Sequence, residues 1–521
     1  MTDAPQDKWT SKLGIILAVA GSAVGLGNFL RFPVQAVRNG GGAFMIPYLV
    51  ALVLLGIPLM WIEWTVGRYG GAFGHSTAPG MFHRLWRNRY IKYFGLIGIF
   101  GPIVIFIFYT YVESWTLAYA FFSLSGKYAG AADQKAMAGF LKSYQGLDPA
   151  GPFRGLGTAY IFFLLTFAAN CWIVFRGISK GIEWLCKWAM PALLVIAVAL
   201  AVRVLSLGAP VNPAWTPLGG LGYMWNPDFE ALKNPDVWLA AAGQIFFTLS
   251  VGIGVILTYA SYLSRRDDVA LSGLTAAGTN ELAEVVLGGT IIIPAAFVFF
   301  GQPEMEAIAK GASFDLGFVT MPLIFTRVPA GAVFGCLWFL LLFLAGMTSS
   351  ISLAQPAVAF LTDELGITKR KAAIVFVVIC FVLCQPTIFF LGHGVLDELD
   401  FWGGTFCLVL FATIETILFG WFFGIDKAWS ELHYGADIRI PRFYRYTIKY
   451  VTPLFLLAVL GTWLYQKGID KILMKDIAAA DRPYVLGARL MLVLLLVGLA
   501  VALKIAWNRR RDVWDRTEAE P

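Results

Sequence analysis

The chain has 521 residues, of which 58% are hydrophobic, 15% aromatic and 14% charged, and its net charge is +7. This composition excludes an ordinary soluble globular protein. The basic residues are spread over loops between apolar runs, so the positive charge does not indicate a nucleic-acid partner. Apolar runs of the roughly 20 residues that a bilayer crossing requires recur from end to end. We therefore predict an all-α polytopic protein of the lipid bilayer.

Twelve apolar segments are predicted to be transmembrane helices. Their approximate limits are 11–38, 42–70, 90–124, 157–175, 182–206, 237–262, 272–300, 333–364, 370–391, 396–423, 445–467 and 484–507. The first segment follows a charged start and contains Arg31, so we expect no cleavable signal peptide.

The distribution of lysine and arginine predicts the orientation. Basic residues lie in the loops after the second, fourth, sixth and eighth spans and in the tail: Arg84, Arg87, Arg89, Lys92, Arg176, Lys180, Arg265, Arg266, Lys369, Arg370, Lys371, Arg509, Arg510 and Arg511. The opposite loops, 125–156, 207–236 and 301–332, are longer and less basic. Because basic loops stay on the cytoplasmic side, we expect both termini there.

The first span contains helix-breaking residues in its middle. Gly21, Gly25 and Gly27 fall within residues 21–28, together with Ser22 and Asn28. Each glycine costs a helix about 1 kcal/mol relative to alanine, and broken backbone at membrane depth is tolerated only where it lines a cavity or binds something. Close helix packing through small residues is the alternative. The polar neighbours favour a binding function.

The sixth span contains a second interrupted stretch, residues 244–254, with Thr248, Ser250, Gly252 and Gly254. Paired broken helices at corresponding positions of two halves indicate a transporter site. The spacing of five spans predicts two five-helix repeats, 11–206 and 237–423. Residues 445–507 would form two further helices, and 1–10 and 508–521 would be cytoplasmic segments.

Polar residues inside the spans suggest ligands. The eighth span carries hydroxyls over 345–352, and oxygen ligands without a carboxylate cage favour sodium, although such hydroxyls often bond to their own helix. Glu281 and Glu284 lie in the seventh span, and ionisable residues inside a membrane usually have a function. The alternative is that they lie near the end of the helix and are exposed to water there. Tyr109 is either functional or an aromatic packing residue.

Further charged residues lie near the spans. Arg31 either snorkels to the interface or pairs with Asp397 and Asp400. Glu63 is a buried carboxylate that we interpret as part of a structural pair. The six cysteines and four histidines show no metal-ligand spacing, and nothing pairs a nucleophile with a base, so we expect neither an enzyme nor an organic cofactor.

Long stretches of the chain resemble the neurotransmitter:sodium symporter family, whose bacterial members are closest. They include AGSAVGLGNFLRFP, NGGGAFMIPY, GIPLMWIEW, YVESWTLA, RGISKGIE, GQIFFTLSVGIG, EVVLGG, AGMTSSIS and DELDFWGG. The resemblance covers Trp9 to about Arg511. It implies that the two five-helix repeats are inverted relative to each other, with broken helices 1 and 6. It also implies alternating access and sodium-coupled import of neutral, hydrophobic L-amino acids across a bacterial inner membrane.

The resemblance also implies two sodium sites. The first would use Ala23, Asn28, Thr248 and Asn280 together with the substrate carboxylate. The second would use Gly21, Val24, Ala345, Thr348 and Ser349.

The amino acid would bind between these sites. Its contacts would be Ala23, Leu26, Gly27, Ile105, Tyr109, Phe247, Thr248, Ser250, Ile253, Ser349 and Leu353. Gate residues would be Arg31, Asp397 and Asp400 outside, and Ser261, Tyr262 and Asp363 inside.

Several positions depart from the family pattern. Ser22 replaces an asparagine, Ile253 a phenylalanine and Leu353 an isoleucine, so the pocket is reshaped. Gln6 stands where an inner-gate arginine is usual; either Lys8 substitutes or the gate is looser. Glu284 supplies a fixed carboxylate where chloride-dependent relatives hold an anion, which implies chloride independence and allows proton countertransport.

One alternative function belongs to a different class. The same scaffold could act as a ligand-gated channel or a non-transporting amino-acid sensor. The sequence leaves the oligomeric state open, although the last two spans lie outside the repeat and could serve homodimer contacts.

Overall fold

The computed structural model describes residues 9–311, 313–510 and 514. The predicted all-α class is confirmed, because helices dominate the described residues and the β pairing found in them is an isolated antiparallel bridge between Gly41 and Pro227. Several spans contain π-helical turns, such as η1 (Leu52–Gly56), η4 (Leu282–Gly288) and η8 (Asp400–Phe406), and turns of this kind inside α-helices are frequent at functional sites.

The first half of the chain forms the elements up to the fifth predicted span and the connection beyond it. In order they are α1 (Lys12–Ala23), α2 (Leu26–Arg38), α3 (Gly42–Ala51), η1 (Leu52–Gly56), α4 (Ile57–Gly71), α5 (Ala78–Leu85), α6 (Ile91–Phe94), α7 (Ile97–Ser125), α8 (Gln134–Tyr144), α9 (Gly157–Phe175), η2 (Ile178–Glu183), α10 (Trp184–Leu205), α11 (Pro217–Trp225) and η3 (Phe229–Lys233).

The second half begins with the second interrupted span. Its elements are α12 (Pro235–Thr248), α13 (Val255–Ala260), α14 (Val269–Glu281), η4 (Leu282–Gly288), α15 (Gly289–Ala309), α16 (Ser313–Asp315), η5 (Leu316–Thr320), α17 (Met321–Thr326), α18 (Gly331–Ala359), η6 (Phe360–Glu364), α19 (Lys369–Phe389), η7 (Leu391–His393), α20 (Val395–Leu399), η8 (Asp400–Phe406), α21 (Cys407–Ile417), η9 (Leu418–Phe422), α22 (Ile425–His433), α23 (Phe443–Tyr446), η10 (Thr447–Val451), α24 (Thr452–Trp463), η11 (Leu464–Gly468), α25 (Ile469–Ile472) and α26 (Arg482–Arg509).

The structure confirms the all-α class but not the predicted number of transmembrane spans. Within the described residues, ten helices are long and apolar enough to cross a membrane, and the bent pair α1–α2 makes an eleventh. The predicted span 237–262 is divided into α12 and α13, which are too short to count singly. The total of twelve therefore stays a prediction.

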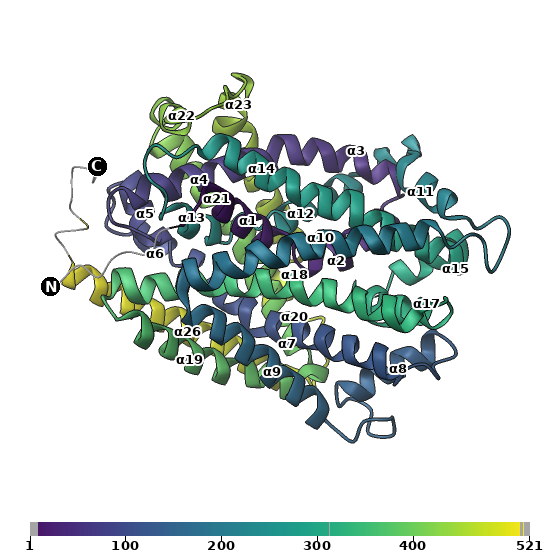
Figure 1. Ribbon diagram of the computed structural model, residues 1–521. Helices are drawn as coiled ribbons and strands as arrows, with labels where there is room; N and C mark the ends of the chain where they lie inside the picture. The colour runs from purple at the N-terminus through teal and green to yellow at the C-terminus, as the bar shows by residue number, and fades with distance from the viewer. Residues whose placement is uncertain (1–8, 312, 511–513, 515–521) are drawn as a thin grey trace.

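The helices run roughly side by side as a bundle (Figure 1). The short helices α5 and α6 lie at one end, and α8, α11 and α17 lie at the other (Figure 1). The three long, weakly basic loops thus share one end of the bundle, opposite the basic loop that holds Arg84 and Lys92.

The centre of the bundle is built on the close approach of α7 and α18. A Cβ at Gly346 would lie 2.8 Å from Cγ of Glu113, and one at Gly335 would lie 3.1 Å from Oγ of Ser123. Small residues allow such contact, which stabilises helix pairs in lipid by close packing. In contrast, α26 has Leu490, Leu494 and Val497 more than half exposed, as a lipid-facing helix requires.

Candidate functional site

The first span breaks between α1 and α2, which meet at an angle of 48°. The last helical bond before the break runs from the Val24 amide to the Ala20 carbonyl at 2.7 Å. A Cβ at Gly25 would lie 2.8 Å from the Ser349 hydroxyl and 2.9 Å from the Tyr109 hydroxyl. Glycine is therefore required here, because the broken backbone lies directly against α7 and α18.

The second break connects α12 and α13 through residues 249–254. Gly252 and Gly254 have φ of +76° and +89°, and Ser250 has φ of +52°. A positive φ is costly for serine and is retained only where the surroundings enforce it. The Ser250 hydroxyl donates to the Ser22 carbonyl at 3.0 Å, so the two breaks are in direct contact.

The residues predicted for the first sodium site lie together. The Asn28 amide nitrogen is 3.2 Å from the Thr248 hydroxyl, and the amides of Asn28 and Asn280 are 2.7 Å apart. Asn280 also lies 3.0 Å from the Thr248 hydroxyl and 3.2 Å from the Ala23 carbonyl oxygen. The neutral oxygens of this group suit a hard monovalent cation.

Glu284 extends the same cluster. The Thr248 hydroxyl donates to its carboxylate, Gln244 donates to it at 2.9 Å, and Tyr48 donates at 3.0 Å. The Tyr48 hydroxyl also lies 2.8 Å from Glu281. Sequence reasoning named Glu284 but missed Gln244 and Tyr48 as its partners, since both look like ordinary residues of apolar spans.

The residues predicted for the second sodium site lie between α1 and α18. The Ser349 hydroxyl donates to the carbonyls of Gly21 at 3.3 Å and Ser22 at 3.0 Å. A Cβ at Gly21 would be 3.1 Å from Cβ of Thr348, whose hydroxyl donates to the Ala345 carbonyl at 3.1 Å. Val24, the fifth member, is buried at the end of α1.

The predicted amino-acid contacts surround the start of α2. The Leu26 amide donates to the Tyr109 hydroxyl at 2.9 Å. A Cβ at Gly27 would lie 2.4 Å from the Phe247 ring, so that ring closes over the break. The apolar members come from α7, the second break and α18 and are buried: Ile105, Ile253 and Leu353.

The predicted outer gate is partly assembled. The Arg31 guanidinium lies 4.3 Å from the centre of the Phe247 ring, a cation–π geometry. Arg31 also interacts electrostatically with Asp400. Asp397 lies three positions before Asp400, in α20, and its charged neighbours are Lys471, Glu398 and Asp400.

The predicted inner gate brings two of its residues together. The Tyr262 hydroxyl donates to Asp363 at 3.0 Å, whereas Ser261 donates to the Thr258 carbonyl of its own segment at 2.7 Å. Gln6 and Lys8 lie outside the described residues. Trp9 donates to the Tyr259 carbonyl at 3.0 Å and packs on the ring of that tyrosine, which seats the start of the first span.

Buried acids form further contacts that sequence reasoning did not place. Glu63 accepts a hydrogen bond from the Gly252 amide in the second break, and its neighbour is Glu415. Glu113 accepts from Asn170 at 3.1 and 3.2 Å. Glu183 accepts a hydrogen bond from the Thr10 amide, just before α1. The sequence feature that can identify these three residues is the presence of an acidic side chain within an apolar run.

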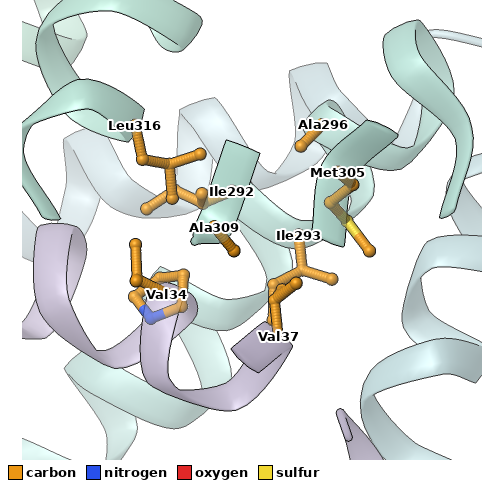
Figure 2. A pocket seen from close by; sticks show the side chains of 9 residues that line it. Val34, Val37, Ile292, Ile293, Ala296, Met305, Ala309 and Leu316 are labelled. Atoms are coloured by element: carbon orange, nitrogen blue, oxygen red, sulfur yellow. The ribbon is translucent and has the colours of Figure 1, made fainter. Parts of the chain in front are cut away.

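A small apolar cavity lies apart from this site (Figure 2). It measures about 10 Å³ and lies between α2, α15 and η5, where it is lined by Pro33, Val34, Val37, Ile292, Ile293, Ala296, Met305, Ala309 and Leu316. A space of this size holds at most one water molecule, and its walls offer that water few polar partners. It is a packing gap and no ligand pocket.

The described part of the chain contains no candidate site for a transition-metal ion. No group of three or more histidine, cysteine or acidic residues is placed to hold a metal ion there, and all six cysteines are free thiols.

The comparison with protein families decides the assignment. The model of the Sodium:neurotransmitter symporter family matches residues 6–138 and 151–506. The chain belongs to the sodium:neurotransmitter symporter family. The resemblance noted from sequence is thereby confirmed, and the symporter is a membrane transporter of a sodium-dependent family.

Individual relatives of this symporter support the family assignment. An uncharacterized sodium-dependent transporter of Methanocaldococcus jannaschii is 31% identical over 469 residues, which cover 88% of this chain and 90% of the relative. The sodium-dependent serotonin transporter of Drosophila melanogaster is 26% identical over 509 residues, 88% of this chain and 76% of the relative.

A solved structure resembles the symporter along most of its length. The crystal structure of MhsT in complex with L-phenylalanine has a TM-score of 0.74 and 31% sequence identity. The match covers 88% of this chain and 99% of MhsT. The symporter thus shares the fold of that protein.

Proposed function

We propose that this symporter imports neutral, hydrophobic L-amino acids together with sodium by alternating access. The observation that carries the proposal is the contact between the two helix breaks, where Ser250 reaches the Ser22 carbonyl. Unwound carbonyls favour cations, and the amino end of α2, which carries the positive end of the helix dipole, favours a carboxylate. A zwitterionic amino acid and a cation fit this arrangement of charge.

The apolar lining supports a neutral side chain on the substrate. Ile105, Ile253 and Leu353 are buried and offer no partner for a charged group, and an unpaired buried charge is strongly disfavoured. The related MhsT was solved with L-phenylalanine, a hydrophobic amino acid. A competition panel of twenty amino acids against one radiolabelled ligand would rank the preferences.

Two sodium ions are proposed to couple transport. At the first site, Ala23 and Thr248 would serve both the ion and the amino acid, so the substrate carboxylate would lie beside the cation. Opposite charges about 4 Å apart attract by about 4 kcal/mol at an effective dielectric constant of about 20. Binding of either species would therefore strengthen binding of the other by the same factor.

Chloride independence is proposed from Glu284. Its carboxylate is bonded to Thr248, Gln244 and Tyr48, so a fixed negative charge is held beside the first sodium site. A mobile anion is then not needed to balance the cation. If Glu284 takes up a proton after sodium has left, the return step would carry that proton outward.

The remaining organisation is proposed on the pattern of the sequence. Two inverted five-helix repeats, 11–206 and 237–423, would surround the site, with the helices of 445–507 outside them. Both termini would lie in the cytoplasm of a bacterial cell, because basic loops stay on that side of the membrane. The exposed apolar face of α26 would meet lipid or a second copy of the chain.

Uptake into proteoliposomes tests the function. An inward sodium gradient is expected to drive accumulation of a radiolabelled hydrophobic amino acid, and dissipating the gradient with a sodium ionophore is expected to abolish it. Accumulation that ignores the gradient contradicts sodium coupling. Binding without uptake indicates a sensor, and sustained sodium current in a bilayer indicates a channel.

A further inference from the structure

The carboxylate of Glu183 is bound to the beginning of α1. It accepts hydrogen bonds from the Thr10 amide at 2.9 Å, from the Thr10 hydroxyl, and from the Ser11 hydroxyl at 3.3 Å. Glu183 is 1% exposed, and its one salt-bridge partner among the described residues is Lys187, at 2.8 Å. Three of its four partner groups therefore belong to the segment that starts the first span.

The local geometry of α1 is adapted to this contact. A Cβ at Gly14 would lie 2.1 Å from Oε1 of Glu183, so only glycine lets the carboxylate reach the helix backbone. Ser11 caps the helix and accepts from the Gly14 amide at 3.0 Å. A negative charge at the amino end of a helix is favourable because the free amides there carry positive partial charge.

The other end of α1 is seated on the same neighbour. A Cβ at Gly21 would lie 3.3 Å from Sδ of Met190 and 3.4 Å from Sγ of Cys186, both on α10. Thus α1 lies along α10 from its first turn to the predicted sodium ligands at its end. The charged contacts are confined to the first of these two places, where Lys187 on α10 also donates to the Thr10 hydroxyl at 3.0 Å.

We propose that Glu183 is a positioning residue that latches α1 in the closed inner conformation, and that this latch must open for release to the cytoplasm. The inference rests on the proposed function. Moving α1 away from α10 would strip Glu183 of its α1 partners and leave it with Lys187. The same movement would carry away Gly21, Ala23 and Val24, so the strength of the latch would help to set sodium affinity.

A native thiol reports the movement. Cys186 is fully buried beside Gly21, and we expect it to become accessible when α1 leaves α10. In the full-length protein with the other five cysteines replaced by alanine, labelling of Cys186 by a small maleimide is measured in sodium buffer without amino acid. Sodium affinity and the unfolding temperature are measured on the same samples.

Glu183→Gln is expected to raise the labelling rate and to weaken sodium binding, each by about tenfold, since charge-assisted hydrogen bonds are lost. Glu183→Asp keeps the charge and is expected to recover part of both values. Glu230→Gln is the matched control, because Glu230 forms an exposed pair with Lys233. Its labelling and sodium affinity are expected to equal those of the unmodified protein.

Thr10→Val provides a second route if Glu183→Gln does not fold. It removes one hydroxyl on the α1 side and is expected to raise labelling by about threefold. The proposal is overturned if the folded variants label Cys186 at the control rate, or if they lose sodium binding without exposing Cys186. Failure of sodium-driven uptake by the unmodified protein contradicts the proposed function, whereas normal uptake with unchanged labelling in the variants contradicts the latch alone.

Discussion

The Thr248 hydroxyl donates a hydrogen bond to the Glu284 carboxylate, so a predicted sodium ligand and the predicted substitute for chloride form one unit. Thr248 ends α12 and Glu284 lies in η4, the π-helical turn of the seventh span. One hydroxyl thus contacts the carboxylate while its oxygen faces Asn28 and Asn280, so Glu284 lies directly beside the residues predicted for the first sodium site.

Thr248→Val keeps the shape of the side chain and removes this hydroxyl. Sodium and amino-acid affinity are expected to fall together, by about tenfold, because a shared ligand is lost. Isothermal titration with each ligand at fixed concentrations of the other measures both. Thr110→Val is the control, since Thr110 donates to the Phe106 carbonyl of its own helix at 2.9 Å. Loss of amino-acid affinity alone would contradict a shared site.

Glu284→Ser removes the fixed charge and leaves a small polar side chain. Uptake by this variant is expected to require chloride, whereas uptake by the unmodified protein continues when chloride is replaced by gluconate. The reason is that a cation in a low-dielectric site needs a compensating negative charge. Transport by the variant that is equally fast in gluconate would refute the assignment of Glu284.

Tyr109→Phe removes the hydroxyl that accepts a hydrogen bond from the Leu26 amide at 2.9 Å. Amino-acid affinity is expected to fall by about tenfold, because the same hydroxyl is proposed to bind the substrate carboxylate. Equilibrium binding of a radiolabelled substrate provides the measurement. Tyr111→Phe, two residues further along α7 with its ring packed on Trp115, is the matched control and should bind normally.

Gly252→Ala tests the second helix break. At φ of +76° a side chain is strained, and its Cβ would lie 2.5 Å from the Leu408 carbonyl oxygen. The variant is expected to be destabilised by about 1–3 kcal/mol and to unfold at a lower temperature in detergent. Gly243→Ala lies within α12 with open space around its Cβ and should be neutral or stabilising. Equal unfolding temperatures for both variants would contradict a backbone requirement for glycine at this break.

The pH dependence of stability tests a contact between α5 and α26. His83 lies edge-on to Trp507 at 4.8 Å between ring centres, and burial lowers the pKa of its imidazole below the ordinary 6.5. The unfolded chain then binds the proton more readily, so stability is expected to fall as pH drops below about 6.5. Thermal unfolding between pH 7.5 and 5.5 measures this, and His83→Gln should show a shallower decline. If the unfolding temperatures of the variant and the unmodified protein fall equally with pH, His83 is not the cause of the pH dependence.

Hydropathy and glycine positions were sufficient to predict the class and the broken helices. A long apolar run in lipid must be helical because every backbone group needs a partner, and residues 21–28 and 244–254 are too rich in glycine and polar side chains to continue a helix without reason. The spans 157–175 and 42–70 coincide closely with α9 and with α3 to α4. These features depend on local sequence alone.

The partners of the buried acids were decided by the tertiary structure. Glu284 meets Thr248, Glu63 meets the Gly252 amide, and Glu183 meets Thr10, although 173 positions separate the last two. Hydrophobic periodicity is almost absent from helices that are apolar all round, so it does not reveal which face meets which neighbour. The sequence alone determined that acids lie within the apolar spans, and only packing of distant helices determined which amide or hydroxyl each acid contacts.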